Sequence, residues 1–151
     1  MKIPNTYSEW VNCFDLLKEG MQDTDVLECT RKGTLTLSAG VGERFATQLN
    51  LAIQFRIKKA VDKFDRNMKM NSGDVNLISS VTLALRKEFN YLIQFVQLPV
   101  LNADESKILI DAIKEQASAM QKNLENSAKN LDRTGMLASM IRKNSIDKLE
   151  G

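Results

Sequence analysis

The sequence predicts an all-α protein: an antiparallel helical bundle of about four main helices plus short helices, with coiled-coil-like packing. Apolar residues recur at intervals of three and four along most of the chain, the spacing of one helical face. Only two prolines and seven glycines occur in 151 residues, so little in the sequence interrupts long helices. We expect a single bundle domain over residues 1–135 and an amphipathic tail over 136–151.

The first helix is marked at both ends. Thr6 and Glu9 have the spacing of a capping box, in which each side chain accepts a hydrogen bond from the other residue's backbone N–H. Apolar residues then follow at helical spacing, and Gly20 favours the end of the helix because glycine readily adopts the left-handed conformation. We therefore expect a helix between Thr6 and Gly20 with one apolar face.

A short second helix is expected over 24–33, with Thr24 as its N-cap. Acidic residues lie near its start and basic residues near its end, the order that the helix dipole favours. Residues 34–38 alternate between polar and apolar as a strand does, but the chain offers no partner strand. We interpret them as an extended connector whose Leu35 and Leu37 reach the core; pairing of this edge across a dimer is the alternative.

Two long helices should follow the connector. The first runs from about Ala39 to Met70, and the glycine-containing turn after it suits a helix end. Asp74 can cap the second, which covers about 74–97 and stops at Pro99. Its apolar stripe consists of Val75, Ile78, Val81, Leu85, Phe89, Leu92 and Val96, broadened by Leu77, Ala84, Tyr91 and Phe95.

The last long helix begins at Asn102, which has the spacing of a capping box with Glu105. Its apolar positions follow the steps of a heptad seam with one polar lapse: Ile110, Ile113, Ala117, Met120, Leu124, Ser127 and Leu131. Gly135 interrupts the pattern. The amphipathic tail beyond it folds back, swaps onto a partner or stays loose. The seam and the tail together predict a homo-oligomer.

The residue inventory argues against catalysis. The chain contains no histidine, which excludes histidine-based nucleophilic catalysis and the Glu-x-x-His motif of di-iron bundles. Cys13 and Cys29 have no companion ligands for zinc, so we expect buried free thiols and a reducing compartment. Asp23, Asp25 and Glu28 fit the acidic start of a helix better than a calcium loop. We predict no enzyme, no cofactor and no metal.

Residues 56–69 contain six basic residues, which form the candidate interaction surface: Arg56, Lys58, Lys59, Lys63, Arg66 and Lys69. On a helical wheel of residues 53–69 the basic residues fall on one side. The other side carries Ile53, Ile57, Ala60, Val61, Phe64 and Met68. Asp62 and Asp65 have the spacing to pair with Arg66 and Lys69. We interpret this stretch as the solvated side of a bundle helix, with a modestly positive outer ridge.

The leading functional hypothesis is a non-enzymatic cytoplasmic protein-interaction module: a regulator, adaptor or inhibitor that acts through helical surfaces. The alternative is a nucleic-acid-associated accessory protein that uses the basic ridge. The N-terminus lacks the apolar stretch of a signal peptide, and the most apolar run, "YLIQFVQLPVL", is too short to span a bilayer. We therefore expect a cytoplasmic protein with no membrane contact.

Overall fold

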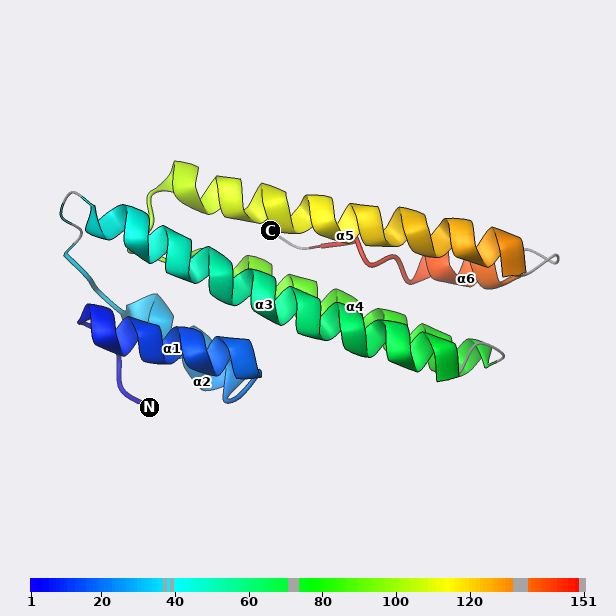
Figure 1. The fold of residues 1–151 in the computed structure, drawn as a ribbon, viewed down its shortest axis with the longest axis horizontal. Coiled ribbons are helices and arrows are strands. Elements are labelled where there is room, and N and C mark those ends of the chain that lie inside the picture. Colours follow the sequence, from blue (N-terminus) through cyan, green and yellow to red (C-terminus); the bar gives the residue numbers. More distant parts are fainter. Residues whose placement is uncertain (37, 39, 71–73, 132–135, 150–151) are drawn as a thin grey trace. The chain divides into compact units, whose positions relative to one another are not determined.

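The computed structural model describes residues 1–36, 38, 40–70, 74–131 and 136–149. Within them the chain forms six helices and no strand, which confirms the predicted all-α helical bundle (Figure 1). The helices are α1 (Tyr7–Glu19), α2 (Asp23–Lys32), α3 (Val41–Met70), α4 (Val75–Phe95), α5 (Ala103–Leu131) and α6 (Met136–Lys143). The predictions for Leu37, for the turn over 71–73 and for Gly135 lie outside the described residues.

Residue contacts group the chain into two compact units. The first comprises residues 1–58 and 94–110, and the second comprises residues 59–93 and 111–151. The first unit therefore contains α1, α2, the N-terminal half of α3 and the start of α5. The second contains the rest of α3, most of α4, the body of α5, and α6.

An aromatic cluster forms the centre of the first unit. Trp10 and Phe14 of α1 both contact Phe45 of α3, with ring centroids 5.3 Å apart in each case. The Trp10 ring meets Phe45 edge-on, a favourable arrangement for the ring quadrupoles. Trp10 is fully buried, and its indole Nε1–H donates to the backbone oxygen of Thr34 at 3.1 Å. The cluster thus joins α1, α3 and the connector that follows α2.

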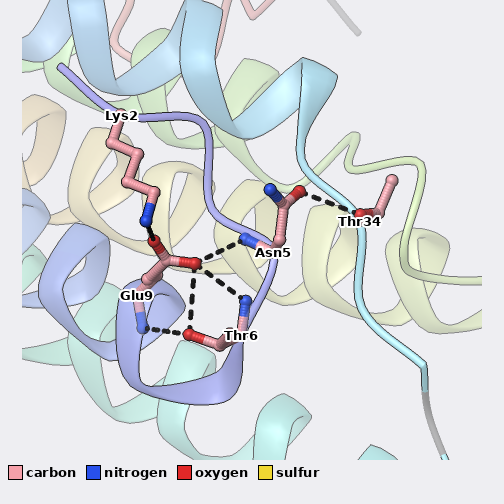
Figure 2. Close-up of polar contacts among 5 residues, drawn as sticks. All are labelled: Lys2, Asn5, Thr6, Glu9 and Thr34. Atoms are coloured by element: carbon pink, nitrogen blue, oxygen red, sulfur yellow. Dashed lines mark hydrogen bonds and ion pairs between the residues drawn. The ribbon is translucent and has the colours of Figure 1, made fainter.

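The start of α1 contains the predicted capping box (Figure 2). The Thr6 hydroxyl accepts from the backbone N–H of Glu9, and the Glu9 carboxylate accepts from the backbone N–H of Thr6. The Lys2 ammonium lies 2.6 Å from the Glu9 carboxylate and, with the N–H of Asn5, lowers the pKa of Glu9 from 4.5 to about 2. Figure 2 also shows Asn5 contacting Thr34, so the segment before α1 is held to the connector.

Local sequence signals set most of the other helix ends. Gly20 ends α1 in the left-handed conformation at φ 71°. The Asp74 carboxylate accepts from the backbone N–H groups of Asn76 and Leu77 at the start of α4. The Asn102 side chain accepts from the N–H of Glu105 at 2.8 Å, so α5 also begins at the predicted cap.

Two details of the predicted helices are wrong. Thr24 does not cap α2, which begins at Asp23 after Gln22 in a left-handed conformation and with no side-chain cap. Leu77 and Ala84 are exposed, so the buried stripe of α4 is narrower than its apolar pattern. The apolar pattern of α4 does not report which elements pack against the helix, so it could not predict the exposure of Leu77 and Ala84.

The C-terminal segment packs within the second unit. The buried Gln121 side chain of α5 donates to the backbone oxygen of Ile141 at 3.3 Å and accepts from the N–H of Ile146 at 2.9 Å. Ile141 and Ile146 are themselves buried, and the Asn144 amide donates to the Ser79 hydroxyl of α4 at 2.7 Å. Ile141 and Ile146 of this segment are therefore buried within the chain, and polar contacts join the segment to α4 and α5.

Gly33, after α2, lies directly against the aromatic cluster. A Cβ atom built on Gly33 would come within 2.5 Å of the Trp10 ring and 2.9 Å of the Pro4 ring. Its φ of −69° suits any residue, so the requirement for glycine here is steric. Gly42, in the first turn of α3, has no neighbouring atom within 4 Å of such a Cβ and offers a matched comparison.

We predict opposite effects for alanine at these two glycines. Gly33→Ala forces the Trp10 ring to move in a packed core and should lower the free energy of unfolding by about 1–3 kcal/mol. Gly42→Ala adds a better helix former in open space and should raise it by roughly 0.5–1 kcal/mol. Urea unfolding followed by tryptophan fluorescence measures both changes. Equal effects of the two substitutions would contradict the packing at Gly33.

Candidate interaction surface on the third helix

The structure separates Arg56 from the other five residues of the predicted basic surface. Lys58, Lys59, Lys63, Arg66 and Lys69 are exposed on α3, whereas Arg56 is 4% exposed. The prediction that Arg56 belongs to a solvent-facing surface is therefore wrong. Whether the other five bind a partner stays a prediction.

Arg56 forms an ion pair with Asp23, and its own side chain is nearly fully buried. No other described ion pair of the first unit includes a side chain buried to this extent. Its guanidinium donates to both carboxylate oxygens of Asp23, at 2.8 and 2.7 Å, in the bidentate geometry that arginine favours. It also donates to the backbone oxygen of Leu17 at 3.3 Å. One side chain of α3 thus holds the last turns of α1 and the first residue of α2.

The burial of Arg56 follows from the docking of α1 and α2. Phe45, Ala52 and Arg56 lie on a strip of α3 that is buried in the first unit. Beyond residue 58 the same side of the helix is exposed, at Lys59 and Lys63. A helical wheel of residues 53–69 does not distinguish the part of this side that α1 and α2 cover from the exposed part beyond residue 58. It therefore groups Arg56 with the exposed basic residues.

We predict that Asp23→Ala is more damaging than Arg56→Met. Asp23→Ala leaves the buried guanidinium without its counter-charge and should cost about 3 kcal/mol, the low end for a broken buried pair because Asp23 is partly exposed. Arg56→Met removes the buried charge itself and should cost less. Asp25→Ala, an exposed acid in the same first turn, is the control and should cost below about 1 kcal/mol. Denaturant unfolding of the three variants checks the order, and a small effect of Asp23→Ala would contradict the role of the pair.

The opposite side of α3 carries two large apolar side chains that the sequence analysis missed. Leu51 and Phe55, one helical turn apart, are 54% and 55% exposed. Arg44, Gln48 and Lys58 are exposed on the same side of the helix. The sequence places Leu51 and Phe55 one helical turn apart, but it does not show whether that side of the helix is covered.

The carboxylates near the basic residues form no described ion pair with them. The expected Asp62–Arg66 and Asp65–Lys69 ion pairs are not formed: in neither pair does a side-chain nitrogen lie within 4.0 Å of a carboxylate oxygen. Lys58, Lys59 and Lys63 likewise form no ion pair with any residue that the structure describes. The exposed basic residues of α3 therefore carry positive charge that no described ion pair offsets.

The described part of the chain offers little chemistry besides this surface. It contains no group of three or more histidine, cysteine, aspartate or glutamate residues able to hold a metal ion. Cys13 and Cys29 are both free thiols; Cys13 is buried as predicted, whereas Cys29 is only partly buried. Burial raises the pKa of the Cys13 thiol to about 11, which keeps it protonated and poorly nucleophilic. Among the described residues, no helix combines the length and apolar character needed to cross a membrane.

Comparisons with protein-family models, with curated proteins and with solved structures find no match to this chain. The fold class accordingly stands on the helices and their packing, and the function must be argued from the surfaces of the molecule itself. Of these, the side of α3 that carries Leu51 and Phe55 in the first unit places two large exposed apolar side chains one helical turn apart, with charged residues beside them.

Proposed function

We propose that the protein is a non-enzymatic cytoplasmic interaction module, a regulator, adaptor or inhibitor, that binds another protein through the outer side of α3. The observation that carries this proposal is the pair Leu51 and Phe55, each about half exposed on one face of a helix. Single exposed apolar residues are ordinary on protein surfaces, but neighbouring ones flanked by polar groups are typical of binding sites.

The binding free energy that Leu51 and Phe55 can contribute is enough to anchor a partner, but only as part of a larger interface. Burying a whole leucine or phenylalanine side chain contributes roughly 1.5–3 kcal/mol. Because each of the two is already half buried, covering both contributes about 1.5–3 kcal/mol in total. Stable complexes need more than this, so neighbouring polar and charged contacts must complete the interface.

Self-association remains a prediction. Two features suggested it, the heptad seam of α5 and the C-terminal tail, and residues of both are buried within the chain. Ile113, Ala117 and Leu124 of the heptad seam are buried by the chain's own helices. Ile141 and Ile146 of the C-terminal segment are buried as well. The exposed face of α3 is a better candidate for contact with another molecule.

Quantitative affinity capture tests the proposal. We expect the tagged wild-type chain, incubated with extract of its native host, to retain a protein that is depleted at least tenfold with the variant Leu51→Ser, Phe55→Ser. The matched control is Leu77→Ser with Met70→Ser, which replaces exposed apolar residues of the second unit and should retain the same protein. Identical protein sets from wild type and the Leu51 and Phe55 variant would contradict the proposal.

A nucleic-acid-associated role is the second candidate. The observation that favours it is the exposed set Lys59, Lys63, Arg66 and Lys69, none of which pairs with a described carboxylate. Phosphate contacts by such residues weaken steeply as salt rises. Nucleic acid detected in the same captured material, and lost with Lys59→Glu and Lys63→Glu, would support this role over the first.

A further inference from the structure

We infer that the outer side of α3 receives an acidic amphipathic helix of another protein, an inference that rests on the proposed function and specifies its partner. The binding surface, here called the docking face, consists of Arg44, Gln48, Leu51, Phe55 and Lys58. All five residues are exposed and belong to the first unit. Their spacing along the helix indicates that the partner is a helix, and their charge indicates that this helix is acidic.

The spacing is that of a seam for a second helix. Successive residues of the docking face are four, three, four and three positions apart, the heptad pattern of helices that pack side by side. Leu51 and Phe55 form its apolar centre. Arg44 lies one heptad before Leu51 and Lys58 one heptad after it, so the cations stand at the two ends of the apolar centre. A partner helix with apolar residues at heptad spacing matches this centre.

The charge determines which helix fits best. The side chains of Arg44 and Lys58 have no ion pair or hydrogen bond with a described residue. The five residues of the docking face include no acid, and the next position of the same seam is Asp62, one turn beyond Lys58 in the second unit. Glutamate or aspartate on the partner, one heptad to either side of its apolar residues, would meet both cations and favour this partner over basic helices.

A second copy of the chain is a poorer occupant. A parallel pair would place Arg44 against Arg44 and Lys58 against Lys58. An antiparallel pair that matches Leu51 with Phe55 sets Lys58 against Gln48 and offers Arg44 the single carboxylate of Asp62. It would also bring together two helices that each carry seven basic and three acidic residues over positions 43–70, an unfavourable charge balance.

The test titrates the full-length, isotope-labelled protein with two helical peptides and follows backbone amide resonances by NMR. The peptides share one leucine stripe at heptad spacing and carry either glutamate or lysine at all flanking positions. We expect the glutamate peptide to shift amides of residues 44–58 and to bind at least tenfold more tightly than the lysine peptide. Phe55→Ser should weaken this binding by roughly five- to tenfold, and Arg44→Glu with Lys58→Glu should invert the preference.

Four results would overturn the inference: equal binding of the two peptides, no binding of either, shifts confined to other residues, or a dimer that Phe55→Ser dissociates in sedimentation experiments. The proposed function fails separately. Capture of a cellular protein could depend on Leu51 and Phe55 but be unchanged by Arg44→Glu with Lys58→Glu. That result would support the proposed interaction module and contradict the inference that its partner is an acidic helix.

Discussion

The bidentate pair between Arg56 and Asp23 is the constraint on which the first unit depends. It joins residues 33 positions apart in the sequence, and the same guanidinium reaches the backbone of Leu17, 39 positions away. Because a buried cation is costly without its partner, α1 and α2 can dock on α3 only where Arg56 meets Asp23. The aromatic contacts of Phe45 with α1 extend that attachment along the same side of α3.

This attachment gives the N-terminal half of α3 two different sides. The side that carries Arg56 is covered, and the side that carries Leu51 and Phe55 stays open. A helix that is apolar on both sides must either be buried all round or leave apolar surface for another molecule. Since α1 and α2 occupy one side, the other is the candidate for binding, and this division connects the fold to the proposed function.

The helices could be predicted because their signals are local. Thr6 and Glu9 form their capping box within one turn, and Gly20 ends its helix through its own conformational freedom. Arg56 could not be placed in the same way, because its burial depends on Asp23, in another helix. The exposure of Phe55 is equally non-local: its neighbours in sequence are apolar and basic alike, and only the docking of α1 and α2 shows which side remains open.

Hydroxyl-radical footprinting of the isolated native chain, read residue by residue by mass spectrometry, tests the two-sided α3 most directly. Phe45 and Phe55 lie on the same helix and react with the same intrinsic chemistry, so each serves as the reference for the other. The account predicts that Phe55 is oxidised many times faster than Phe45, which is fully buried between Trp10 and Phe14. Equal protection of the two rings would contradict it, because the proposed binding side of α3 would then already be covered.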